Sequence, residues 1–153
     1  MNIWQFQSVL TRRLLIWSIF SMVIGGLLQI PRDRFARGVG QQFTAWGLID
    51  ALIAIIGQRA SQKRRAQLVD PLANKVTARE ARNLSKLLWI NTGLDTGYVA
   101  GGAALAFTKR KSNSTWYGHG IGVIIQGVFL FFFDLLHALR LQNKTQSCNG
   151  AKV

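Results

Sequence analysis

The sequence predicts an all-α protein, a bundle of four transmembrane helices. Four long apolar stretches occur along the 153 residues, and a helix needs roughly 20 such residues to cross a bilayer. The formal net charge of +13 lies between these stretches rather than within them, as expected where loop Lys and Arg side chains face anionic headgroups. Because lipid offers the backbone no hydrogen-bond partner, the crossing segments must be helices.

The predicted spans are residues 14–30, 41–57, 87–107 and 121–139, in one membrane domain that covers residues 1–153. The first follows Arg12 and Arg13, as the apolar part of a signal peptide does. It ends at Pro31 without a small-residue cleavage pattern, so we predict a retained helix. The first two spans are short, and their ends need Trp, Gln and Arg side chains that reach the interface.

The segment between the second and third spans, residues 58–86, is predicted to be a basic cytoplasmic loop. Its stretch Thr77-Ala-Arg-Glu80 is typical of a capping box and predicts that the third helix begins near Thr77. This loop and the two termini carry 13 Lys and Arg residues, against 6 in the other two loops. The positive-inside rule therefore places the termini and this loop in the cytoplasm. Four of the loop arginines are expected either to contact anionic headgroups or simply to be solvated: Arg64, Arg65, Arg79 and Arg82.

Three charged residues lie within the predicted spans, namely Asp50, Asp95 and Asp134. Each would cost about 2.5–3.5 kcal/mol at the bilayer centre, so each is expected to face protein or water. In this topology all three lie roughly 7–12 Å from the cytoplasmic end of the apolar zone, at about 1.5 Å per residue. The sequence therefore predicts that the three carboxyl groups share one layer.

No Lys or Arg within the spans neutralises this layer. The carboxyl groups would hold protons, bind a cation, or hydrogen-bond to polar neighbours; the candidates are Asn91, Tyr98, Gln126 and His137. Two interpretations stay open: a proton or cation site near the cytoplasm, or polar contacts that hold helices in register. A lone His with scattered Asp is no metal motif. A single Cys148 excludes an internal disulfide. We predict no metal and no cofactor.

Glycines recur every four residues on the third span, at Gly93, Gly97 and Gly101, and the spacing returns at Gly118 and Gly122. Small residues at this spacing predict a face where another helix packs closely. At about 100° per residue, Asp95 lies nearly opposite this stripe. The third helix is therefore expected to be contacted on two sides.

Two further patterns in the sequence are weaker. Gln precedes Asp by eight residues in both the second and fourth spans, at Gln42 and at Gln126, which suggests two duplicated helical hairpins. The motif GHGIG, residues 118–122, follows no predicted strand and is no dinucleotide site. The four apolar stretches argue against a soluble nucleic-acid binder.

Two segments, NTGLDTGYVAGG (91–102) and GHGIGVIIQGVFLFFFD (118–134), resemble the signature segments of a family of small, uncharacterised bacterial four-helix membrane proteins. WGLIDALIAIIG (46–57) is similar to that family's second helix. The resemblance covers the membrane part and not the charged middle segment. It implies a four-helix integral membrane fold, here in a bacterial inner membrane, and it brings no activity.

The function expected first is non-enzymatic, an accessory or assembly subunit or a self-associating bundle. Its partners would be the bilayer and either a second copy or another membrane protein. One alternative is a proton- or cation-coupled transporter or channel that uses the three aspartates. Another is an intramembrane enzyme acting on lipid, with Asp95, Asp134 and His137 near the headgroups.

Overall fold

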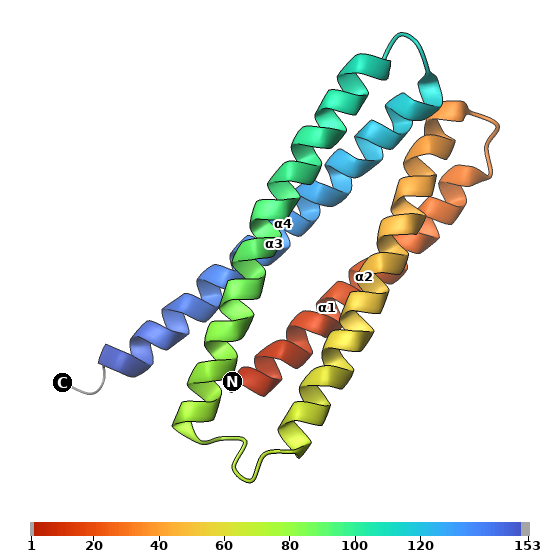
Figure 1. Cartoon of the computed structure of the whole chain (residues 1–153). Coiled ribbons are helices and arrows are strands. Elements are labelled where there is room, and N and C mark those ends of the chain that lie inside the picture. The colour runs from red at the N-terminus through yellow and green to blue at the C-terminus, as the bar shows by residue number, and fades with distance from the viewer. Residues whose placement is uncertain (1, 151–153) are drawn as a thin grey trace.

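A computed structural model describes residues 2–150, with side chains described for residues 2–142. Its four helices are α1 (Ile3–Gln29), α2 (Arg34–Ala66), α3 (Asn74–Lys109) and α4 (Ser114–Gly150). They form the long, strand-free bundle drawn in Figure 1 for the described part of the chain. The predicted all-α four-helix bundle is confirmed. Cys148 lies beyond the described side chains.

Side-chain caps begin three of the helices. Asn2 and Gln5 form a reciprocal capping box at α1, with hydrogen bonds of 2.9 and 3.0 Å. The Asp33 carboxylate caps α2, and Asn113 accepts a backbone hydrogen bond from the first turn of α4. Pro31, which cannot continue a helix, follows the end of α1. The connections 30–33 and 110–113 are consequently short turns.

The predicted loop 58–86 is mostly helical, which corrects that expectation. α2 continues to Ala66 and α3 begins at Asn74, so only residues 67–73 connect them. Thr77 is not the cap: the cap position is Ala73, and the Thr77 hydroxyl donates to its carbonyl oxygen at 3.2 Å. The stretch is rich in Ala, Arg, Lys and Gln, which favour helix even where they are charged.

Three helices are long and apolar enough to cross a membrane: α1, α2 and α4 as far as Gln142. α3 is not among them, although it has 36 residues. Its middle carries polar side chains at Asn91, Thr92, Asp95 and Thr96. That α3 also spans a membrane stays a prediction.

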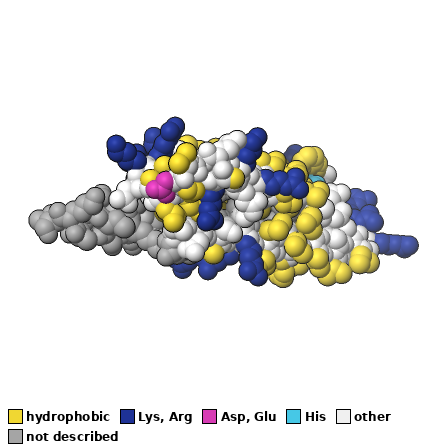
Figure 2. All heavy atoms as spheres, turned by 90° about the horizontal axis from the view of Figure 1, so that it is seen from below, with side chains coloured by type: hydrophobic (Ala, Val, Ile, Leu, Met, Phe, Trp, Pro, Cys, Tyr) yellow, Lys and Arg dark blue, Asp and Glu magenta, His cyan; other side chains and the backbone are white. Residues whose placement is uncertain are grey.

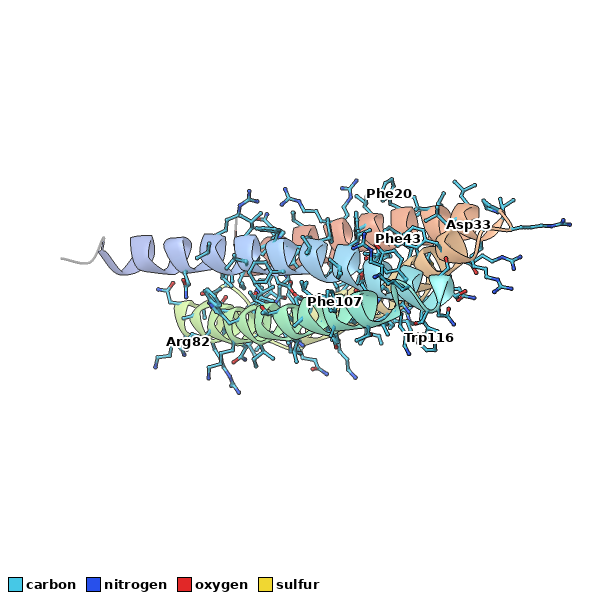
Figure 3. The ribbon with its side chains drawn as sticks, turned by 90° about the horizontal axis from the view of Figure 1, so that it is seen from above. Phe20, Asp33, Phe43, Arg82, Phe107 and Trp116 are labelled. Carbon is cyan, nitrogen blue, oxygen red and sulfur yellow. The ribbon has the colours of Figure 1, made fainter. Side chains whose placement is uncertain are left out.

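The helices form two hairpins, α1 with α2 and α3 with α4, which pack together mainly through α2 and α4. Both termini lie at the end that carries residues 67–73, which we call the connection end, and the two short turns lie at the opposite, turn end (Figure 1). In Figure 3, Arg82 near the start of α3 and Asp33 and Trp116 near the short turns lie at opposite sides of the molecule. The predicted grouping of both termini with the middle segment is therefore observed. The side of a membrane that this end faces stays a prediction.

Glycines bring helix backbones into contact near the turn end. A β-carbon added to Gly40 would lie 2.7 Å from the Gly25 carbonyl oxygen, between α2 and α1. One added to Gly120 would lie 2.6 Å from the Ala106 backbone nitrogen, between α4 and α3. Because real β-carbons stay at least 3.0 Å from such atoms, larger residues would push these helices apart.

Large side chains replace glycine toward the connection end. One buried cluster there contains Ile3, Trp4, Phe6, Leu10, Leu88, Ala138 and Leu141. A smaller cluster of Leu14, Ala54 and Leu130 lies next to it along the helices. Such side chains keep helix axes further apart than glycine does. The bundle is therefore tight at the turn end and wider at the connection end.

Candidate functional site

The three predicted aspartates come together. Asp50 on α2, Asp95 on α3 and Asp134 on α4 line one cavity of about 310 Å³. Their side chains are buried, with Asp50 2% and Asp95 4% exposed. Asp95 interacts electrostatically with both of the others. The constant rise of the helix places the carboxyl groups at one depth, and the fold places all three on the lining of the same cavity.

Two carboxyl oxygens in this cavity have no partner. The Oδ2 atoms of Asp50 and Asp95 are buried and accept no hydrogen bond from any described residue. Asp134 differs, because the Asn91 side chain is its hydrogen-bond partner. A buried polar atom without a partner costs about 1–3 kcal/mol, and more when it is charged. Aspartates that served only to join helices would have both oxygens bonded to the neighbouring helices.

Aromatic and apolar side chains make the walls of the cavity. Trp46 and Tyr98 meet edge to face across it, with ring centroids 4.8 Å apart. Leu14, Leu130 and Phe133 line the deeper wall. The three aspartates therefore lie in a cavity whose other walls are mostly apolar.

A second cavity, of about 500 Å³, adjoins the first on the side of the connection end. The two share four lining residues: Gln7, Arg64, Leu84 and Leu87. Arg64 is the one Lys or Arg among the described residues that line the acidic cavity, and its Nε lies 3.5 Å from the Glu80 carboxylate. Sequence reasoning missed this role, because it assigned Arg64 to a loop rather than to a helix that runs past the cavity.

The acidic cavity also opens sideways between α2 and α3. Ile49 and Ile53 on α2 and Leu87 and Leu94 on α3 line it, and each is about half exposed. Such residues form the rim of an opening. No periodic signal in the sequence separates these rim residues from other apolar residues on the same helices.

Gln126 and His137 lie outside this cavity. Gln126 is fully buried, accepts a hydrogen bond from the Trp17 indole and donates one to Ser21, both at 3.1 Å. The His137 Nδ1 lies 2.6 Å from the Phe133 carbonyl oxygen, and its ring packs on Phe133. Both residues link helices or stabilise one, and neither lines the cavity beside the aspartates.

The predicted glycine stripe on α3 has no neighbour among the residues that the structure describes. A β-carbon added to Gly93, Gly97 or Gly101 would meet nothing within 4 Å. α3 packs on α4 instead through a different face, where a β-carbon on Gly102 would lie 3.0 Å from the Gly120 carbonyl oxygen. The described residues contact α3 on the face that carries Gly102, and the contact on the stripe that the sequence predicts stays a prediction that another molecule would have to fulfil.

The glycines predicted on the fourth span do meet other helices. A β-carbon on Gly118 would overlap the Phe35 carbonyl oxygen, and one on Gly122 would lie 2.7 Å from the Gln42 β-carbon. Other glycines also lie close to a neighbouring helix, among them Gly25, Gly40 and Gly120. They were not predicted, because none of them has another glycine four residues before or after it in the sequence.

The acidic layer is not arranged for a metal ion. Among the described residues, no three His, Cys, Asp or Glu side chains are grouped so that they could hold one. The chemistry open to the site is the binding of protons or of a cation held by charge and hydrogen bonds.

A sequence model of the family of unknown function DUF6992 matches residues 13–135. The match runs through the charged middle segment, where we expected the resemblance to stop, and it includes all three aspartates. No curated protein and no solved structure matches the chain. The matched region covers well over half of the 153 residues, so the chain belongs to this family of unknown function, DUF6992.

Proposed function

We propose that this protein is an integral membrane carrier that binds protons or a cation at the layer formed by Asp50, Asp95 and Asp134. The observation that carries the proposal is the pair of buried, unpartnered carboxyl oxygens in a shared cavity. A carboxylate removed from water without a partner is strongly disfavoured, so it takes up a proton or a cation. Repeated uptake and release of that charge is what a coupled carrier requires.

One-sided access supports transport over a static site. The second cavity leads from the acidic cavity toward the connection end, whereas the opening between α2 and α3 lies near the middle of these helices. Toward the turn end, glycine contacts close α1 on α2 and α3 on α4. Release on the far side would require these tight helix pairs to move apart, in the manner of carriers that alternate access around a central site.

For this function we place α3 in the membrane as the fourth span, with Asp95 facing the cavity. The connection end and both termini are placed in the cytoplasm of a bacterial inner membrane. Exposed arginines at this end, Arg65, Arg79 and Arg82, would contact anionic headgroups. Lys and Arg side chains occur at both ends of the molecule (Figure 2), and we place the connection end in the cytoplasm because it carries more of them.

Proton flux into liposomes that hold the purified protein tests the proposal. Wild type is expected to acidify the lumen under an imposed gradient, and Asp95→Asn to lose most of this flux, because the amide cannot carry the charge. Asp33→Asn is the matched control: Asp33 caps α2 far from the cavity, and Asn caps a helix equally well. Equal flux through wild type and Asp95→Asn would overturn the proposal.

A second candidate function is self-association in the membrane through α3. The specific observation is that Gly93, Gly97 and Gly101 lie open on one face of α3, with no neighbour in the described part of the chain. Stripes of this spacing are sites of helix–helix contact in membranes. The two functions are compatible, because the stripe lies nearly opposite Asp95.

A further inference from the structure

We propose that the ligand of the acidic cavity is an amphipathic organic cation, a compact ammonium group on an apolar body, and that it enters from the lipid between α2 and α3. This inference rests on the proposed function, in that it takes the carboxyl layer to be a cation site. It adds the chemical class of the ligand and the route by which it arrives.

The charged group of such a ligand fits the floor of the cavity. Asp50 and Asp95 each present a buried carboxyl oxygen without a hydrogen-bond partner, and Asp134 stands beside them. A cationic head would supply the missing partners as charge-assisted contacts. The one cationic side chain on the lining, Arg64, lies at the edge of the cavity beside Glu80.

The apolar body of such a ligand fits the walls. Trp46 and Tyr98 meet at the cavity and can face a cation with their rings. A volume of about 310 Å³ falls within the range of small-molecule sites, roughly 300–1,000 Å³. A bare inorganic ion would leave most of this space, and all of the apolar wall, unused.

The route follows from where the rim lies. Ile49, Ile53, Leu87 and Leu94 edge the opening, and all four belong to segments predicted to lie in the bilayer. α2 packs on α1 and α4, and α3 packs on α4. Side-chain contacts bridge the gap between α2 and α3 at two places, Trp46 with Tyr98 and Arg64 with Glu80, and the opening lies between these two contacts. The other way in leads through the second cavity, past the Arg64–Glu80 ion pair, and its polar and charged lining suits an apolar body less well than the lipid does.

Calorimetric titration of the full chain in nanodiscs tests the ligand class. The probe is the benzylammonium ion, whose N–H groups can donate hydrogen bonds to the carboxyl oxygens, and ethylbenzene is its neutral isostere. Wild type is expected to bind the ammonium compound and not the isostere. Asp50→Asn and Asp95→Asn should each weaken binding by about ten-fold or more, as expected for loss of one charged contact. Asp33→Asn should leave binding unchanged.

The outcomes separate this inference from the proposed function. Proton flux that depends on Asp95, together with no binding of the ammonium probe, would overturn the inference and leave the proposed function standing. Absence of both flux and binding would remove both. Equal binding by wild type, Asp50→Asn and Asp95→Asn would show partition into lipid and also overturn the inference.

The route has its own pair of variants. Ile53→Trp narrows the rim between α2 and α3, whereas Ile16→Trp adds the same bulk at a similarly exposed position on α1 away from the cavity. Stopped-flow mixing with the probe is expected to show slower association for Ile53→Trp alone. Identical association rates for the two variants would exclude lateral entry.

Discussion

At the residue scale, the buried polar side chains are of two kinds. Gln126 is wholly buried and has hydrogen-bond partners on α1 for both ends of its amide. Asp50 and Asp95 are almost as buried, yet each keeps an oxygen without a partner. A satisfied buried group adds to stability and an unsatisfied one subtracts from it. The first kind holds the fold, and the second kind marks the site.

Gln126→Leu is expected to destabilise the protein. The substitution leaves the Trp17 indole N–H and the Ser21 hydroxyl without their partner, at a cost of about 1–3 kcal/mol for a stranded buried group. Thermal unfolding in detergent should show a lower melting temperature, while the probe and the protons still reach the aspartates. An unchanged melting temperature would mean that water replaces the amide.

Asp50→Asn is expected to behave in the opposite way. It removes a carboxyl group that lacks a hydrogen-bond partner and that interacts with Asp95, so the melting temperature should stay the same or rise while flux is lost. Functional sites often hold groups that reduce stability. A large loss of stability would instead indicate that Asp50 is a structural contact, which is the interpretation left open by the sequence.

At the scale of the element, α3 has two different faces, one buried in the bundle and one open. Asp95, Gly102 and Ala106 are buried toward the rest of the bundle, whereas Gly93, Gly97 and Gly101 lie open. The helix also carries polar residues, which make it less apolar than the other three helices. A helix of this composition is stabilised more by protein contacts on both of its faces than by contacts with lipid.

Gly97→Leu is expected to leave the monomer folded and to break self-association. A β-carbon at Gly97 meets nothing within the chain, so the melting temperature should change little, whereas a second copy packed on the stripe would be displaced. Cross-linking in membranes and mass measurement in detergent would report the loss. Gly26→Leu is the control, because Gly26 on α1 is equally open but has no glycine four residues before or after it, so it belongs to no stripe. Equal association in both variants would remove the stripe as an interface.

At the scale of the whole molecule, the bundle is closed at one end and open at the other. Glycine contacts join the helices near the short turns, and bulky apolar clusters and two cavities occupy the connection end. Lys and Arg side chains lie around both ends of the molecule (Figure 2). An acidic cavity that opens toward one end of the bundle is the arrangement expected if the protein is the carrier proposed above.

Labelling of single cysteines tests this orientation. In a Cys148→Ser background, Ser112→Cys reports the turn end and Val69→Cys the connection end, since both positions are exposed. A membrane-impermeant maleimide should label Ser112→Cys in intact bacterial cells and label Val69→Cys only after lysis, as the positive-inside rule requires. The reverse pattern would invert the molecule, and labelling of both in intact cells would argue against a membrane-spanning bundle.

The sequence by itself determined the helical class, the approximate place of each helix and the shared depth of Asp50, Asp95 and Asp134. These properties follow from apolar length and from a fixed rise per residue, which are local to each helix. Only the tertiary structure decided which glycines touch a neighbour, that residues 58–66 are helical and α3 already begins at Asn74, and that the aspartates line a cavity with an opening between α2 and α3. Those outcomes depend on how each helix is rotated and spaced against the others, and contacts between residues far apart in the chain set that rotation and spacing.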